Sequence, residues 1–195
     1  MKKILLSLVA IIALSVNAQK KGDIQFGVKA GLNVSTVGDD YGDDFNAKAG
    51  FHIGGLVEIP IAKKFAIQPE LVFSTQGAKS NGHYYRNNRH DATLRLNYIN
   101  IPVLLKYNIT KQFTVEGGPQ VGIRVSSKIK GNDGTNKVNG FTAADLALTA
   151  GVSYRLENNV FFSARHNFGI TNIIDNSYRG SAVNGVFQLS VGYKF

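Results

Sequence analysis

The sequence offers few side chains for covalent chemistry or metal binding. It contains no cysteine, which excludes disulfides, thiolate metal sites, a cysteine nucleophile and a lipidated N-terminal cysteine. Its histidines, His52, His83, His90 and His166, share no metal-ligand spacing beyond the loose pair His83 and His90. Neither a Gly-x-Ser-x-Gly element nor a phosphate-binding loop occurs. We therefore predict no enzyme activity, no cofactor and no metal site, with a loop-borne His/Ser site for lipid modification as the alternative.

Two polar segments carry other residue types that bind ligands. Residues 39–44 (Asp-Asp-Tyr-Gly-Asp-Asp) are acidic enough to attract Ca²⁺, but they lack EF-hand spacing and its closing Glu. We therefore predict a solvated loop there. Residues 83–90 are basic and aromatic, and arginine charge with tyrosine stacking suits phosphates or glycans. This segment is a candidate surface-contact loop, with a variable loop that binds nothing as the alternative. Its candidate contact residues are Tyr84, Tyr85, Arg86 and Arg89.

Charged residues of both signs recur on polar faces along the chain. Together with one histidine, they are Lys29, Lys48, His52, Glu58, Glu70, Glu116, Arg124, Arg155 and Arg165. If these faces line a narrow interior of low dielectric constant, their charges must pair. We predict a polar network in that lumen and at least one contacting pair among its Glu and Arg members. A narrow, gated ion path is the alternative to a purely structural network. The candidate network residues are Lys29, Glu70, Glu116, Arg124 and Arg165.

The elements that carry these residues are predicted to be β-strands, because apolar and polar residues alternate at successive positions. High glycine (21), abundant Tyr (8) and Phe (12), and only 18% charged residues also fit an all-β protein. Short turns are expected at 60–64, 108–112 and 157–159, and long polar loops at 37–46, 77–93, 127–142 and 171–184. The predicted strands span residues 24–35, 47–59, 65–76, 94–107, 113–126, 144–156, 160–170 and 185–195.

Four features favour a membrane barrel over a soluble, lipocalin-type barrel. The apolar faces are nearly free of charge over about 9–11 residues, the length of a tilted membrane strand. Short and long connections alternate, as in outer-membrane barrels. The chain ends on Phe195, an apolar-face aromatic that resembles the signal read by barrel assembly machinery. Aromatic residues gather at the short-turn ends of the strands, as in an interfacial girdle: Phe26, Phe65, Tyr107, Phe113, Tyr154, Phe162 and Tyr193.

The N-terminus predicts export. Residues 1–3 are basic, residues 4–16 are apolar, and Val16-Asn17-Ala18 presents small residues to a signal peptidase. We predict a cleavable signal peptide at 1–18 and a barrel domain at 19–195. A membrane anchor is the alternative, although the apolar run is shorter than the about 20 residues of a helical bilayer span. Loss of Lys2 and Lys3 with the signal lowers the formal charge from +9 by two, to +7.

Two irregularities interrupt the strand pattern. In the strand at 94–107, apolar residues up to Tyr98 share one parity and those from Ile99 onward share the other. We predict a β-bulge near Tyr98–Asn100, because one extra residue reverses the faces. The second irregularity is a proline on each of three consecutive strands, at similar heights. Each removes a ladder donor and marks either a tolerated bulge or a weakened seam that binds a partner or opens laterally. They are Pro69, Pro102 and Pro119.

Five segments resemble the PorT-like outer-membrane β-barrel family of Bacteroidota. They are 27–33 (GVKAGLN), 68–78 (QPELVFSTQGA), 98–107 (YINIPVLLKY), 117–120 (GGPQ) and 164–172 (ARHNFGITN). The last is similar to the family's Arg-Tyr-x-x-Gly-Leu-x-Asn segment, with His166 where Tyr is usual. The resemblance spans the mature chain and implies an outer-membrane barrel. PorT itself is associated with type IX secretion, which suggests an accessory role in such a machine.

The sequence thus predicts an all-β, eight-stranded antiparallel up-and-down transmembrane β-barrel with both termini periplasmic. We expect a structural or surface-interaction protein of the outer membrane with at most a narrow pore. The alternatives are an accessory component of a secretion or uptake machine and an outer-membrane lipid-modifying enzyme. Expected partners are outer-membrane lipids and lipopolysaccharide, barrel assembly machinery through Phe195, and secretion-complex proteins in the first alternative. Nucleic acid is not expected, because the basic residues divide between lumen and loops.

Overall fold

The fold consists of long β-strands joined by turns and loops. The computed structural model describes residues 24–39, 45–80, 84–85, 88–89, 92–131, 134–138, 140–173 and 182–195. The predicted signal peptide at 1–18 and residues 40–44 of the acidic segment lie outside these ranges. The described residues contain no helix that is long and apolar enough to cross a membrane.

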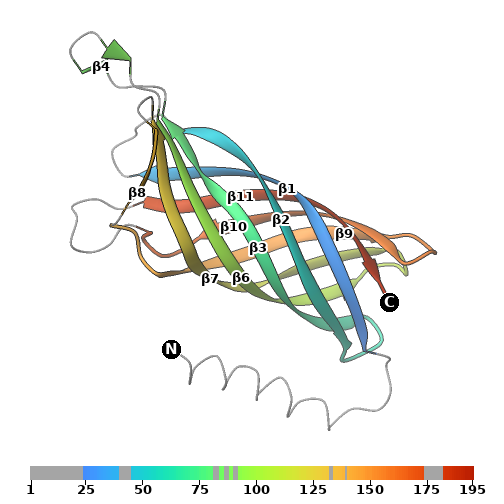
Figure 1. Ribbon diagram of the computed structural model, residues 1–195. Coiled ribbons are helices and arrows are strands. Elements are labelled where there is room, and N and C mark those ends of the chain that lie inside the picture. Colours follow the sequence, from blue (N-terminus) through green and yellow to red (C-terminus); the bar gives the residue numbers. More distant parts are fainter. Residues whose placement is uncertain are drawn as a thin grey trace.

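Eight long strands within the described ranges close into an antiparallel barrel (Figure 1). Neighbouring strands pair in the order β6-β3-β2-β1-β11-β10-β9-β7, and pairing of β6 with β7 closes the circle. All eight strands expected from the alternation are present, and the predicted barrel is confirmed. Their bounds are β1 (Gln25–Asp39), β2 (Phe45–Pro60), β3 (Phe65–Ser80), β6 (Ala92–Asn108), β7 (Phe113–Gly131), β9 (Ala144–Arg155), β10 (Val160–Gly169) and β11 (Ala182–Lys194).

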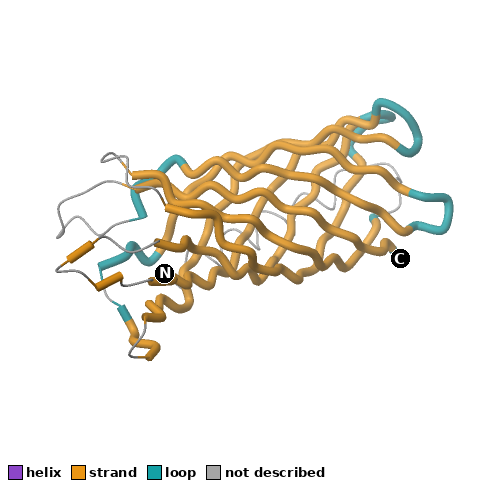
Figure 2. The backbone as a smooth tube through the Cα atoms, turned by 90° about the horizontal axis from the view of Figure 1, so that it is seen from above, coloured by secondary structure: helices purple, strands orange, loops and turns teal. Residues whose placement is uncertain are grey.

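The connections differ at the two ends of the barrel (Figure 2). We call the end with connections 61–64, 109–112 and 156–159 the short-turn end, and the opposite end the long-loop end. At the long-loop end, strands β4 (Tyr84–Tyr85) and β5 (Asn88–Arg89) pair with each other, and β8 (Gly134–Lys137) pairs with β7. The loop expected at 127–142 was therefore partly wrong. This polar segment includes a hairpin of β7 and β8, whose backbone pairing does not depend on an apolar face.

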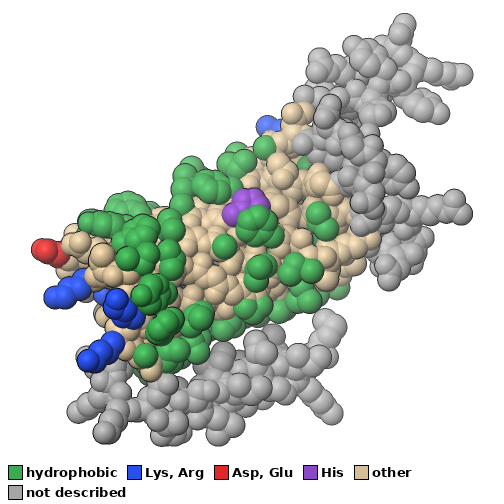
Figure 3. Space-filling view, turned by 180° about the vertical axis from the view of Figure 1, so that it is seen from behind, with side chains coloured by type: hydrophobic (Ala, Val, Ile, Leu, Met, Phe, Trp, Pro, Cys, Tyr) green, Lys and Arg blue, Asp and Glu red, His purple; other side chains and the backbone are tan. Residues whose placement is uncertain are grey.

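The outer wall of the barrel is apolar (Figure 3). On the face that Figure 3 shows, hydrophobic side chains cover much of the wall, and most of the basic side chains in view gather at one end. Leu32, in the middle of β1, is 68% exposed and Leu189, in the middle of β11, is 52% exposed. Exposed apolar surface of this extent requires lipid rather than water as its solvent. Near the short-turn end, Phe65 and Tyr107 pack with ring centroids 5.1 Å apart, where the aromatic girdle was expected.

Strand β6 corrects the predicted bulge. Its even-numbered residues face inward continuously from Leu96 to Lys106, so the faces do not reverse at Tyr98–Asn100. The extra residue lies on the partner strand instead. Asn97 pairs with Ser126 and Tyr98 pairs with Arg124, which leaves one unpaired residue on β7. The apolar phase slips in the sequence because Leu96 and Tyr98 point into the barrel, not because β6 bulges.

The three prolines lie beside interruptions of the strand ladders. Pairing of β3 with β6 stops at Pro69 and resumes at Val72. Pairing of β6 with β7 stops at Pro102 and resumes at Leu105, opposite the segment that holds Pro119. No such gap occurs between β9, β10 and β11 in the pairs the structure describes. The prolines thus align as a band of interrupted pairing across three neighbouring strands.

Candidate functional site

The lumen near the short-turn end is filled by a continuous chain of ion pairs. Side chains of alternating charge come from seven of the eight barrel strands, so the chain crosses the interior rather than following one seam. Their N–O distances are 2.6, 2.9, 2.5, 3.6, 2.9 and 2.5 Å in order. The members in order are Lys29, Glu70, Arg165, Glu116, Lys106, Glu58 and Lys194.

Gln68 turns part of this chain into a closed ring. Its Nε2 donates to Glu70 Oε1 at 2.6 Å, and its Oε1 accepts from Lys106 Nζ at 3.0 Å. Arg165 spans the ring, because Nε bonds Glu116 and Nη1 bonds both carboxylate oxygens of Glu70. Burial makes each unpaired charge expensive, so every carboxylate is shared between two cations. Through Arg165, this arrangement connects β10 to β3 and β7, with which β10 does not pair.

The predicted network residues divide into two groups. Lys29, Glu70, Glu116 and Arg165 are members of the ionic chain, and Arg165 contacts both carboxylates. Arg124 is not a member, contrary to the prediction. It lies on β7 beside the register shift, where its guanidinium donates to the backbone carbonyls of Thr142 and Phe141 at 2.9 and 2.8 Å. Its role is to tie the segment after β8 to the barrel.

Sequence reasoning missed two cations of the chain. Lys106 and Lys194 both lie at inward positions near the short-turn end and are buried. Neither lysine is among the network residues predicted from the sequence, although each lies at an inward position of its strand. The only indication in the sequence that they enter the lumen is their position in the alternation of inward and outward residues. Lys48, expected in the lumen, is buried opposite the inward-facing Ser35, beside a register shift of β2 between Ala47 and His52. It is not a member of the ionic chain and also borders a groove in the outer wall.

Above the ions, the lumen holds neutral hydrogen-bonding groups. His52 lies at its centre, with Nδ1 2.7 Å from Asn33 Oδ1 and Nε2 2.8 Å from Ser190 Oγ. Asn33 also donates to Ser74 Oγ at 2.9 Å and accepts from Gln188 at 3.1 Å. A buried polar group is stable only when its partners are supplied, and this layer supplies them from four strands. His52 is therefore a structural hydrogen-bonding residue.

The long-loop end of the lumen is closed by apolar side chains. This apolar plug contains the inward-facing Leu96 and Tyr98, both at most 1% exposed, which sequence reasoning had placed on the lipid face. Between the plug and the ions, the space around Asn100, Gln120 and Thr149 is too narrow for a water molecule. From the short-turn end, the lumen thus contains the ionic chain, then neutral polar groups and then the apolar plug, with one further buried carboxylate, Asp145, on β9. The plug consists of Val37, Ala78, Leu96, Tyr98, Ile173 and Ala182.

The remaining candidate residues lie in or near the loops. Tyr84, Tyr85 and Arg89 belong to the short pair β4 and β5, while Arg86 lies outside the described residues. Of the four histidines, only His52 and His166 are described. His166 faces outward on β10 and packs on Phe168 with ring centroids 4.2 Å apart. Among the described residues, no group of three metal-ligating side chains comes together.

Comparison with known proteins agrees with this geometry. The crystal structure of Ail, the attachment invasion locus protein of Yersinia pestis, is similar with a TM-score of 0.54 and 14% identity, over 89% of this chain and 100% of that one. Neisserial surface protein A (NspA) is similar with a TM-score of 0.59 and 15% identity, over 87% of this chain and 97% of that one. These likenesses show the fold. A search of curated proteins found no match.

A family model supplies the assignment. The model of the outer membrane protein beta-barrel domain matches residues 17–175, which is most of the chain. Its match covers seven of the eight barrel strands, all but β11. The apolar outer wall and the closed ladder are the features that such a domain needs to cross a bilayer without unpaired backbone groups. The chain therefore belongs to the outer membrane protein β-barrel domain family.

Proposed function

We propose that this protein is a non-conducting outer-membrane barrel with a structural or surface-interaction role. The observation that carries the proposal is the filled lumen, which contains an ionic chain, a neutral polar layer and an apolar plug in succession. An eight-stranded barrel is only wide enough for its own side chains. Buried ion pairs resist hydration because breaking one leaves an uncompensated charge. The function then lies on the outer wall and in the loops.

Conductance in a planar lipid bilayer tests the closed lumen. The purified barrel should add no stepwise current in KCl, because no continuous water path passes the ionic chain and the plug. Arg165→Ser, which removes the side chain that spans the ring, provides the comparison. Recurrent current steps from the wild-type protein, with a reversal potential that follows the KCl gradient, would contradict the proposal. A heat-modifiable gel shift of each sample shows that a folded barrel was added.

We propose further that the long loops face the cell exterior and that both termini are periplasmic. Alternation of short and long connections supports this orientation. Because the chain has no cysteine, single introduced thiols report on it cleanly. Asn136→Cys at the long-loop end should react with a membrane-impermeant maleimide on intact cells. Lys63→Cys at the short-turn end should react only after the outer membrane is permeabilised, and the reverse pattern would refute the orientation.

An accessory role in type IX-like secretion is the second candidate. It is supported by the PorT-like segments, among them 68–78 and 98–107, which carry two of the three aligned prolines. The band of interrupted pairing offers unpaired backbone groups to which a partner strand can attach. Mild solubilisation and crosslinking mass spectrometry from native membranes separate the two candidates. Co-purification with a large membrane complex supports the secretion role, whereas isolation of the barrel alone supports the first proposal.

A further inference from the structure

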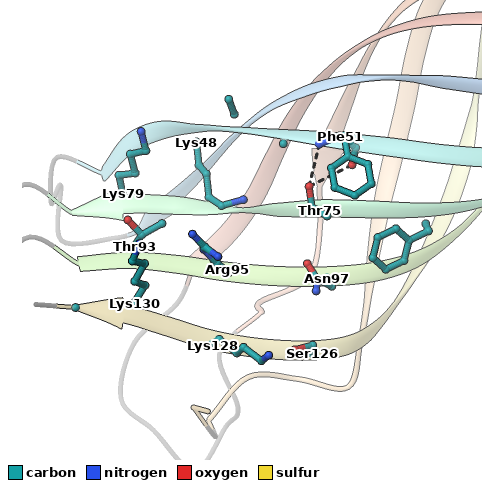
Figure 4. A pocket seen from close by; sticks show the side chains of 14 residues that line it. Lys48, Phe51, Thr75, Lys79, Thr93, Arg95, Asn97, Ser126, Lys128 and Lys130 are labelled. Carbon is teal, nitrogen blue, oxygen red and sulfur yellow. Dashed lines mark hydrogen bonds between the residues drawn. The ribbon is translucent and has the colours of Figure 1, made fainter. Parts of the chain in front are cut away.

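A groove rich in positive charge crosses the outer wall near the long-loop end (Figure 4). We call it the basic groove. It has a volume of about 710 Å³ and is formed by β2, β3, β6 and β7. Its described lining contains no carboxylate, and none of its cations forms an ion pair within the described part of the chain. The cations are Lys48, Lys79, Arg95, Lys128 and Lys130.

The strand registers order the groove residues in rows across β3, β6 and β7. Two rows carry positive charge, the third carries uncharged hydrogen-bonding groups, and the fourth is apolar and continues into the lipid-facing wall. Polarity therefore falls stepwise from the long-loop end toward the middle of the barrel. The rows in that order are Lys79, Thr93 and Lys130; Gly77, Arg95 and Lys128; Thr75, Asn97 and Ser126; and Phe73, Ile99 and Ile123.

The basic groove is electrostatically unfavourable when empty. Arg95 and Lys128 lie directly opposite each other on paired strands, and like charges in that position are destabilising. The charges of Lys79 and Arg95 also repel the ammonium group of Lys48. A bound anion would offset these repulsions, because it attracts each of the cations. Arginine and lysine together suit phosphate, the first through paired N–H groups and the second as a point charge.

The lower boundary of the basic groove indicates that its ligand has an apolar part. Phe51 and Phe73 form its floor, with ring centroids 6.1 Å apart, and Phe51 is 51% exposed. Thr75 Oγ1 hydrogen-bonds the backbone N–H and carbonyl of Phe51, so the row of hydrogen-bonding groups begins directly above this ring. A free anion would contact only the upper rows. An amphiphile would contact phosphate-binding, hydrogen-bonding and apolar rows at once.

We propose that the basic groove binds the phosphorylated headgroup of an outer-leaflet glycolipid of the lipid A type. The lipid phosphate lies between Arg95 and Lys128, its sugar hydroxyls bond the row of Asn97 and Ser126, and an acyl chain packs on Phe51 and Phe73. The proposal rests on the proposed function, because only a barrel with its long loops outside places this groove in the outer leaflet. Phospholipid and free phosphate are the competing sources of the same anionic group.

Native mass spectrometry of the purified barrel in detergent micelles tests the site. The ligands are bisphosphorylated lipid A, the same lipid with its phosphates removed, phosphatidylglycerol and inorganic phosphate. Wild type should retain bisphosphorylated lipid A, and Arg95→Gln with Lys128→Gln should weaken that binding about tenfold or more. Arg95→Lys with Lys128→Arg keeps the charges and should largely preserve binding. Lys63→Gln with Lys111→Gln removes equal charge at the short-turn end and should leave it unchanged.

Three results would overturn the proposal. They are equal retention of the dephosphorylated lipid, equal retention of phosphatidylglycerol or inorganic phosphate, and equal losses in the two Gln variants. Because the substituted side chains are exposed, the barrel should still fold, and an unchanged heat-modifiable gel shift checks this for each variant. The thiol-labelling pattern of Asn136→Cys and Lys63→Cys is read separately. If the long loops face outward and lipid A does not bind, only the proposal of lipid A binding in the basic groove is refuted. If the long loops face inward, the proposed orientation is refuted.

Discussion

Arg165 is the residue on which most of the lumen network depends. Its side chain is 2% exposed and bonds two carboxylates that belong to β3 and β7, neither of which is next to β10 in the barrel. We expect Arg165→Met to lower the free energy of unfolding by about 3–5 kcal/mol, because it leaves Glu70 and Glu116 short of a counter-ion. Urea titration in detergent or lipid vesicles measures this change.

Arg155 provides the control for that prediction. It is a half-buried arginine on β9 with a hydrogen bond to Gln25 Oε1 at 2.9 Å. Arg155→Met removes the same charge and nearly the same volume, and it should cost only about 1 kcal/mol. Equal losses for the two variants would show that the ionic chain contributes no more to stability than a peripheral hydrogen bond.

Two neighbouring glycines on β2 allow a matched test of packing. A Cβ on the inward-facing Gly54 would lie 2.3 Å from the carbonyl oxygen of Leu71 and 2.8 Å from Val72 Cα. A Cβ on Gly55 would meet nothing closer than 3.8 Å. We therefore expect Gly54→Ala to destabilise the barrel by about 1–3 kcal/mol and Gly55→Ala to change its stability by less than about 0.5 kcal/mol. Urea midpoints of the two variants should differ accordingly, and coincident midpoints would contradict the close approach.

Sequence parity predicts which residues enter the lumen but not which of them meet. Lys29, Glu70, Glu116 and Arg165 were all assigned inward correctly from the alternation alone. Their pairing depends on strand tilt and stagger, which bring Arg165 level with Glu70 across the lumen and leave Arg124 at the long-loop end. Tilt and stagger are properties of the closed sheet, so no local pattern reports them.

At the scale of elements, the proline band should be less protected than the uninterrupted strands β9, β10 and β11. Ladder pairs are missing beside Pro69 and Pro102 but not along β9, β10 and β11. Backbone amides that lack a ladder partner exchange with solvent by smaller openings. Hydrogen exchange measured in nanodiscs should therefore be faster around Pro69, Pro102 and Pro119 than at the same height in β9–β11. Equal rates would mean that the prolines are simply tolerated.

The last strand carries the proposed contact with the assembly machinery. Phe195 is 71% exposed and contacts Tyr193 edge-on at 5.4 Å, so it contributes little to packing. We expect Phe195→Ala to lower the amount of barrel assembled in cells several-fold and to leave the heat-shift temperature of the assembled protein unchanged. Phe187→Ala, on the same face in the middle of β11, is the control. Equal reductions in assembly would argue against a special role for the terminal aromatic.

The lipid-facing parts of the long strands were predictable because one face of each must meet lipid over a fixed height. Strands β1, β3 and β7, however, continue to residues 39, 80 and 131, beyond the predicted ends at 35, 76 and 126. Strand β6 was misread only beyond that height, where Leu96 and Tyr98 turn into the plug. The hairpin of β7 and β8 was missed for the same reason. Outside the bilayer, apolar residues can point inward and polar residues can pair as strands, so alternation no longer identifies the outer face.

For the whole molecule, the apolar wall predicts how the cost of a charge depends on depth. Leu189 lies in the middle of β11 and faces outward, while Val183 faces outward near the long-loop end of the same strand. Leu189→Arg should lower the free energy of unfolding in phospholipid vesicles by about 2–4 kcal/mol, and Val183→Arg by about 0–1 kcal/mol. Similar costs at both positions would contradict a bilayer centred on the barrel.

The ionic chain also has a consequence for the order in which the barrel is built. Strands β1 to β7 contribute Lys29, Lys106 and the three carboxylates to it, a net charge of −1 from two positive and three negative groups. The last two strands contribute Arg165 and Lys194, a charge of +2. Without β10 and β11, three carboxylates share only Lys29 and Lys106, so one negative charge is left uncompensated and is expected to stay hydrated. We therefore expect the interior to lose its last water when β11 closes on β1, because Arg165 and Lys194 then supply the remaining positive charge.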